Sequence, residues 1–259
     1  MSSVTLKNQE LEVRRVASEN PRQSNRPLVF LHEGLGSVAM WRGFPQWVAN
    51  ATGCEAIVYS RTGYGNSSPA ALPRNVSFMH EEALEVLPAL LAALGVERPI
   101  LVGHSDGGSI ALIHAARARL PVSALILMAP HVMVEPLTIA SIQKIRSTYS
   151  DSNLPQRLAR YHRDVDAAFW GWNDIWLHPE FAEWSIVSLL SSIRCPILAI
   201  QGEDDEYGTM AQIESISGNV ADVLELRLPN CGHSPHLDQP QAVIDAMVGF
   251  INELGSRHE

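Results

Sequence analysis

Short runs rich in apolar residues recur along the chain, separated by longer stretches in which polar and apolar residues mix. Runs of this length are typical of strands buried on both faces. A looser alternation from Val4 to Val16 predicts two edge strands before the first run. The runs that we interpret as strands are Leu28–Leu31, Ala56–Tyr59, Ile100–Val102, Ala124–Met128, Ile197–Ile200 and Val223–Leu228.

Apolar residues at helical spacing occupy several of the intervening stretches. One predicted helix over about 84–94 ends at Gly95, and Pro88 is expected to kink it. A second follows the Ile100–Val102 strand and runs to about Leu120, and the last begins near Asp238, which we interpret as its N-cap. Strands that alternate with helices predict an α/β fold with a mostly parallel, doubly wound sheet.

Residues 132–194 interrupt this alternation. They carry no strand pattern and include four of the six tryptophans. We therefore predict a helical cap over 132–194, inserted into a core made of 1–131 and 195–259. Its aromatic side chains could hold the cap together or line a ligand pocket, and the sequence leaves both open.

The composition of the chain indicates a globular protein and argues against some classes of partner. Hydrophobic residues make up 46% of the 259 residues and charged residues 18%, enough to bury a large core. The net charge of −9 argues against a nucleic-acid partner, because no basic surplus exists to neutralise phosphates. The N-terminal stretch has no apolar signal core, and no run is long enough to cross a membrane. We expect a cytoplasmic protein, and the sequence leaves open whether it is a monomer or a homodimer.

The segment Ile100–Ala116 places G-H-S-D-G between a predicted strand and a predicted helix. Gly-x-Ser-x-Gly in this context is a nucleophile elbow, a sharp turn that exposes the serine hydroxyl. The glycines on either side avoid a clash at the turn. The N–H of Asp106 lies at a helix N-terminus, where negative charge is stabilised. We predict Ser105 as the nucleophile and the Asp106 backbone as an oxyanion donor.

A serine hydroxyl needs a base within hydrogen-bond reach and a third group that orients the base. In a parallel sheet such groups gather where strands end. Asp204 and Asp205 follow the Ile197–Ile200 strand, and two histidines, His233 and His236, follow the last strand. The order along the chain is therefore serine, acid, histidine. Glu135, after the Ala124–Met128 strand, is a less favoured acid. A zinc site from the two histidines lacks a third ligand at a known spacing.

Four sequence segments together resemble the α/β-hydrolase family, in particular its capped serine hydrolases such as esterases, lactonases and C–C hydrolases. The segments are Y-S-R-T-G-Y-G-N-S at 59–67, G-H-S-D-G-G at 103–108, G-E-D-D at 202–205 and C-G-H-S-P-H-L-D-Q-P at 231–240. The resemblance implies the α/β-hydrolase type of sheet with an inserted helical cap. It also implies a catalytic triad of Ser105, His233 and Asp205, because the family acid usually lies three positions after the glycine of its loop.

The second oxyanion donor is expected in the loop after Leu31. The family usually has His-Gly-x there, with the third residue donating its N–H, which selects Gly34. This chain has Glu33 where glycine is usual. An ionised carboxylate beside an oxyanion hole would oppose the developing charge. We therefore expect Glu33 to be turned away or paired with Arg61 or another cation.

Three functions are compatible with these residues. The first is hydrolysis of a small, partly apolar carboxylic ester or lactone through an acyl-enzyme, as in a carboxylesterase. The second is another reaction on the same triad, such as meta-cleavage-type C–C, amide or peroxide chemistry. The third is a slow-turnover ligand receptor of the same fold. None of these readings calls for a metal or a cofactor, and no G-x-G-x-x-G follows the first strands.

Overall fold

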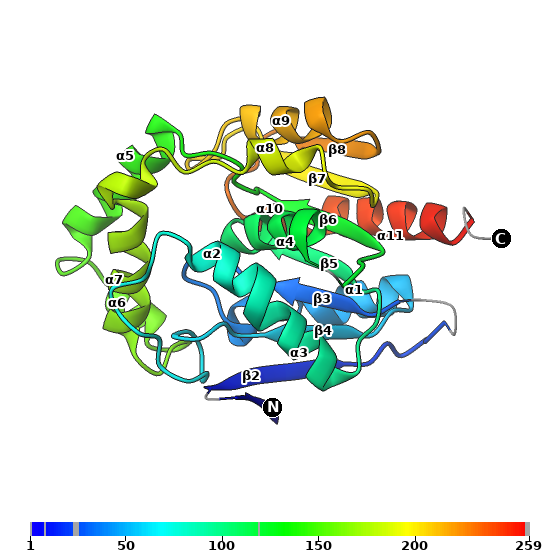
Figure 1. Cartoon of the computed structure of the whole chain (residues 1–259), viewed down its shortest axis with the longest axis horizontal. Helices are drawn as coiled ribbons and strands as arrows, with labels where there is room; N and C mark the ends of the chain where they lie inside the picture. Colours follow the sequence, from blue (N-terminus) through cyan, green and yellow to red (C-terminus); the bar gives the residue numbers. More distant parts are fainter. Residues whose placement is uncertain (1, 8, 23–25, 119, 257–259) are drawn as a thin grey trace.

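The computed structural model describes residues 2–7, 9–22, 26–118 and 120–256. An eight-stranded sheet in the order β1-β2-β4-β3-β5-β6-β7-β8 forms its centre (Figure 1). β1 pairs with β2 and β2 with β4 in antiparallel fashion, and every other neighbouring pair is parallel. The strands are β1 (Ser2–Leu6), β2 (Gln9–Val16), β3 (Leu28–Leu31), β4 (Ala56–Tyr59), β5 (Ile100–His104), β6 (Ala124–Met128), β7 (Ile197–Gly202) and β8 (Val223–Leu228).

Helices cover both faces of the sheet. Figure 1 shows α3 and α4 in front of the strands and α1 and α11 behind them. The predicted α/β fold with a mostly parallel sheet is confirmed. Of the two predicted edge strands, β1 lies at the sheet edge, whereas β2 lies between β1 and β4. The helices outside the segment between β6 and β7 are α1 (Phe44–Thr52), α2 (Phe78–Glu81), α3 (Leu87–Leu94), α4 (Asp106–Arg117), α9 (Ala211–Asn219), α10 (Pro235–Asp238) and α11 (Pro240–Ser256).

The two cores follow from strand periodicity. Along β3, Val29 and Leu31 pack into the core on the α3 and α4 face, whereas Leu28 and Phe30 pack into the core on the α1 and α11 face. All four side chains are fully buried. Successive strand residues point to opposite faces, so a central strand must be apolar at every position. This is why the buried strands are visible as unbroken apolar runs.

Helix boundaries differ from the sequence-based expectation in three places. Pro88 lies within a helical run that continues from α2 through a π-helical turn, Glu82–Val86, into α3, so its missing N–H falls where the hydrogen-bond pattern changes from π to α. α4 ends at Arg117, short of Leu120. Asp238 is the last residue of α10, and its carboxylate accepts the N–H of Gly232 at 2.9 Å.

The segment between β6 and β7 is helical. Figure 1 shows its first three helices beyond the edge at which the parallel strands end. The fourth, α8, packs against α4 and α9 beside the sheet. None of the helices within the described ranges is long and apolar enough to cross a membrane. The helices of the segment are α5 (Pro136–Thr148), α6 (Leu154–Leu158), α7 (Val165–Trp176) and α8 (Val187–Leu190), with a 3₁₀ turn at Pro179–Phe181.

Candidate active site

Ser105 lies on the sharp turn between β5 and α4. Its backbone has φ 53° and ψ −119°, a strained conformation for a residue with a side chain. A Cβ on Gly103 would come within 2.5 Å of the Gly107 carbonyl oxygen, and a Cβ on Gly107 within 2.1 Å of the Leu31 carbonyl oxygen. Both glycines are therefore required by close backbone contacts, which is the physical basis of the Gly-x-Ser-x-Gly spacing.

His233 connects Ser105 to Asp205. Its Nε2 atom lies 2.9 Å from Ser105 Oγ, and its Nδ1 atom lies 2.9 Å and 2.8 Å from the two carboxylate oxygens of Asp205. A carboxylate only accepts, so Nδ1 carries the hydrogen and Nε2 is left to accept the hydrogen of the serine. The structure thus brings together three residues from the ends of β5, β7 and β8.

The Asp205 carboxylate is held by the turn that carries it. Oδ1 accepts the backbone N–H groups of Tyr207 at 2.7 Å and Gly208 at 3.2 Å, and Oδ2 accepts the Gln201 amide at 2.7 Å. Burial alone would raise the pKa of Asp205, but the hydrogen bond and charge of His233 and the Tyr207 N–H lower it. Asp205 is therefore ionised.

The other candidate acids and bases lie elsewhere. Asp204 has an exposed side chain, while Glu135 accepts hydrogen bonds from Thr209 and Gln212. His236 is buried against the Trp41 ring at a centroid distance of 4.9 Å. Burial, with the charge of the neighbouring His104, lowers the pKa of His236 to about 3. No group of three or more potential metal ligands occurs among the described residues.

Both predicted oxyanion donors line the cavity beside Ser105. Asp106 is the first residue of α4, so its N–H lies at the positive end of that helix. Gly34 lies under the indole of Trp172, whose Nε1 atom would be 2.2 Å from a Cβ at position 34. A side chain at position 34 would therefore displace Trp172.

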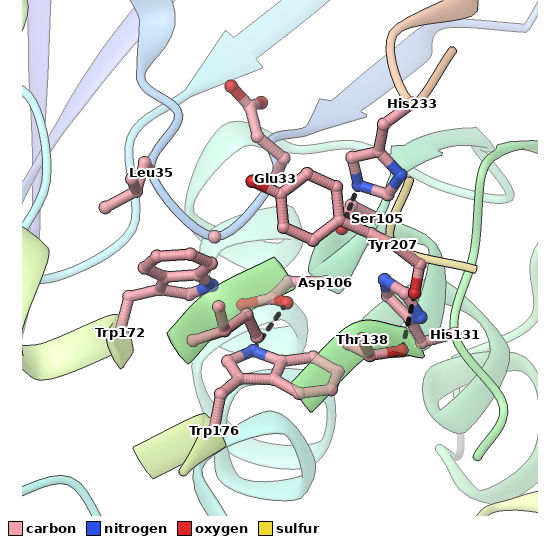
Figure 2. A pocket seen from close by; sticks show the side chains of 12 residues that line it. Glu33, Leu35, Ser105, Asp106, His131, Thr138, Trp172, Trp176, Tyr207 and His233 are labelled. Atoms are coloured by element: carbon pink, nitrogen blue, oxygen red, sulfur yellow. Dashed lines mark hydrogen bonds between the residues drawn. The ribbon is translucent and has the colours of Figure 1, made fainter. Parts of the chain in front are cut away.

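The Glu33 carboxylate extends away from the cavity (Figure 2). It lies 3.5 Å from Nδ1 of His104, whereas Arg61 donates to the Glu33 carbonyl oxygen at 2.8 Å. Burial would raise the pKa of Glu33, but the contact with His104 holds it far below its usual range. Glu33 is thus both turned away and paired. The partner is His104, and Arg61 instead lies 3.7 Å from the Asp106 carboxylate.

The Asp106 side chain is buried and lines the cavity. Oδ1 accepts the indole N–H of Trp176 at 3.2 Å. Burial raises the pKa of this carboxyl, while the charge of Arg61 and the Trp176 hydrogen bond lower it. Asp106 therefore does more than favour the helix dipole, because it also connects α4 to α7.

A cavity of about 110 Å³ lies against Ser105 and His233. Figure 2 shows Trp172, Trp176 and His131 arranged around it. The two tryptophans come from α7, four residues apart and therefore on one helix face. The sequence shows this spacing, but nothing local to α7 says that this face points into the cavity. The cavity is lined by Glu33, Gly34, Leu35, Ser105, Asp106, His131, Thr138, Ile142, Trp172, Trp176, Tyr207 and His233.

A parallel sheet with a serine, a histidine and a carboxylate at its strand ends defines the class of α/β proteins with hydrolase architecture. Residues 28–246 match the sequence model of the Alpha/beta hydrolase family, and the chain belongs to this family.

Relatives within this family are varied. The chain is 22% identical to 2-hydroxy-6-oxo-6-phenylhexa-2,4-dienoate hydrolase of Burkholderia cepacia, over 90% of each chain. Its fold is similar to a crystal structure of proline iminopeptidase from Mycobacterium smegmatis, with a TM-score of 0.81, 20% identity and coverage of 100% and 99%. It is also similar to the enol-lactonase from Burkholderia xenovorans LB400, with a TM-score of 0.75, 16% identity and coverage of 97% and 100%. The family membership and the names of these relatives support a hydrolytic enzyme.

Proposed function

We propose that the protein is a serine hydrolase that cleaves a small carboxylic ester or lactone through an acyl-enzyme at Ser105. The observation that carries this proposal is the hydrogen-bonded chain of Ser105, His233 and Asp205, with its serine facing a cavity. A nucleophile, a base and an orienting acid in this order are the elements of acyl transfer.

In the proposed reaction, Ser105 Oγ attacks the acyl carbon while its proton passes to Nε2 of His233. Asp205 stabilises the imidazolium that forms. The developing oxyanion accepts hydrogen bonds from the backbone N–H groups of Gly34 and Asp106. When the C–O bond breaks, His233 returns the proton to the leaving alcohol. A water molecule then repeats the sequence on the acyl-enzyme, which releases the acid and restores Ser105.

The cavity favours a small, partly apolar and uncharged substrate. Trp172, Trp176 and Tyr207 make up part of its wall, and its volume of about 110 Å³ suits a short chain or a single small ring. Among the described residues that line it, none is lysine or arginine. A C–C hydrolase of the dienoate type must bind an acid, so this lining favours a neutral ester over that alternative.

We further propose that residues 132–194 act as a cap, with α5 and α7 covering the cavity through Ile142, Trp172 and Trp176. The mechanism needs no metal or cofactor. The net charge of −9 supports a small-molecule substrate rather than a nucleic-acid partner. We place the protein in the cytoplasm, with no membrane partner.

The test is release of nitrophenol from a series of nitrophenyl esters, acetate to octanoate, by the wild type and Ser105→Ala. We expect turnover with an optimum at short chains and a loss of at least about a thousandfold in Ser105→Ala. Circular dichroism would show that the variant is folded. No turnover from a folded wild type would contradict the proposal and favour a C–C hydrolase or a ligand receptor.

A further inference from the structure

Two carboxylate–histidine pairs contact His233. The proposed reaction uses the first, Asp205 with His233 itself, and the second is Glu33 with His104. Asp205 contacts the His233 ring. The second contact reaches the backbone of the same residue, because Nε2 of His104 lies 2.7 Å from the His233 carbonyl oxygen. Nδ1 of His104 lies 3.5 Å from Oε2 of Glu33. His104 thus stands between the loop that carries Gly34 and the loop that carries His233.

The contacts of His104 determine its protonation. A carbonyl oxygen only accepts, so Nε2 carries a hydrogen. A neutral imidazole would then present the lone pair of Nδ1 to the Glu33 carboxylate, which is repulsive. His104 is 1% exposed, so water cannot relieve this repulsion. Both ring nitrogens therefore carry hydrogens. The 3.5 Å contact is an ion pair rather than a well-aligned hydrogen bond.

The groups around His104 favour its protonated form, while the neighbouring His236 stays neutral. Burial lowers the pKa of His104, but the contact with Glu33, the His233 carbonyl and the charge of Asp205 raise it above its ordinary value. The His233 and His236 rings lie at centroid distances of 5.2 Å and 4.9 Å from His104. His236 stays neutral, as its pKa of about 3 shows.

Gly36 leaves space for the Glu33 carboxylate to lie beside His104. A Cβ on Gly36 would lie 2.3 Å from Oε2 of Glu33, so the glycine allows the carboxylate to fold back over the loop. The N–H of Gly36 donates to the Glu33 carbonyl oxygen at 3.1 Å, and Arg61 donates to the same oxygen. Glu33 is therefore fixed at its backbone as well as at its side chain.

We propose that Glu33 and His104 form an ion pair that positions the loop of His233 against the loop of Gly34. The inference rests on the proposed function, because the base and an oxyanion donor lie on these two loops. Both must stay within a fraction of an ångström of their productive positions for acyl transfer. Glu33 and His104 are positioning residues, and neither needs to touch the substrate.

Removal of the carboxylate tests the positioning role. Glu33→Ala should lower kcat by roughly tenfold to a hundredfold with little change in KM, because the loops lose their register while the substrate cavity remains. The matched control is Glu55→Ala, which removes an exposed carboxylate paired with Arg15 at 3.1 Å. The control should keep the wild-type kcat. A wild-type kcat in folded Glu33→Ala would overturn the proposal.

Glu33→Gln separates the charge from the contacts. The glutamine amide can donate to Nδ1 of a neutral His104, so kcat near pH 7 should stay within about threefold of the wild type. The wild type should lose activity at alkaline pH as His104 loses its proton, and Glu33→Gln should lack that loss. The same alkaline decline in both proteins would contradict the ion pair.

Nitrogen NMR of the imidazole rings provides a readout that does not depend on turnover. In the wild type at pH 7, both nitrogens of His104 should show protonated shifts, and in Glu33→Gln one of them should not. A neutral His104 in the wild type would overturn the ion pair. A wild type without ester turnover overturns the proposed function instead, and the NMR result then decides the ion pair alone.

Discussion

The strand-end loops and the helical segment between β6 and β7 contribute different things to the candidate site. The loops hold its polar groups through short backbone contacts, such as the N–H groups of Tyr207 and Gly208 on Asp205. The helical segment contributes aromatic surface and is held by ring packing. Tyr149, for example, stacks on Phe169 with a distance of 3.6 Å between the ring centroids. A polar contact between the two regions is the Trp176 N–H on Asp106.

The strand-end loops therefore fix the positions of the polar groups, and the helical segment fixes the shape of the cavity. Parallel strands in fixed register set the distances between Ser105, His233 and Asp205, so a change in the helical segment leaves those distances largely intact. A change in α7 alters the cavity wall instead. The same kind of sheet can therefore serve substrates of different size.

The largest expected effect is in the strand-end loops, at Asp205. Asp205→Asn keeps an acceptor for the Tyr207 N–H, but its amide turns an N–H toward His233 and favours the wrong tautomer. We expect kcat for nitrophenyl acetate to fall by roughly a thousandfold to ten-thousandfold.

Asp204→Asn is the matched control, because its side chain is exposed. It should keep the wild-type kcat. A loss of less than about tenfold in folded Asp205→Asn would show that another group orients His233.

The second effect is where the two regions touch, at Gly34. Gly34→Ala places a Cβ where the Trp172 indole lies, so either the loop that carries Gly34 or α7 must shift. We expect kcat to fall by roughly tenfold to a hundredfold, measured with nitrophenyl acetate.

Two variants show whether the clash is the cause. Gly34→Ala combined with Trp172→Ala should recover part of the lost kcat. Gly249→Ala in α11, where a Cβ meets nothing within 4 Å, should not reduce it. A double variant no faster than Gly34→Ala would argue against the clash.

Much of the loop region was predictable from sequence because its determinants are local. Buried strands appear as apolar runs, and the turn at Ser105 requires glycines at fixed offsets. The motif offset selects Asp205, whose carboxylate lies 2.8 Å from the His233 ring in the structure. In each case a few adjacent residues carry the signal.

Tertiary contacts between distant residues were not predictable in the same way. The sequence suggests Arg61 as a partner for the Glu33 carboxylate, yet His104, on another strand, occupies that place. The selection of Trp172 and Trp176 as cavity walls depends on how α7 packs over the loops. Neither their aromatic character nor their helical spacing could fix that packing.

The third effect is in the helical segment, at Trp172. Trp172→Ala removes a large part of the cavity wall, so the preferred acyl chain should lengthen by two or more carbons. We expect kcat/KM to fall several-fold for the acetate ester and to rise several-fold for the hexanoate ester, since each methylene contributes about 1–3 kcal/mol.

Trp170→Ala is the matched control on the same helix, because Trp170 packs against Arg146 rather than the cavity. Its chain-length optimum should not change. An unchanged optimum in Trp172→Ala would place the acyl chain elsewhere.

The smallest effect is a pH dependence of stability that the Glu33–His104 ion pair gives to the loop region. The pKa of His104 is raised above its ordinary value of 6.5, so its contribution is fully present below that pH and is lost as pH rises through the folded value. The pKa of Glu33 is lowered from 4.5, so its contribution is present above pH 4.5 and is lost only in stronger acid. Urea unfolding of the wild type and Glu33→Gln should therefore differ most between pH 4.5 and 6.5, by on the order of 1 kcal/mol, and the difference should shrink as pH rises. A difference that is constant or grows toward alkaline pH would mean that His104 is neutral, and the two loops would then be joined by the His233 carbonyl contact without a charge.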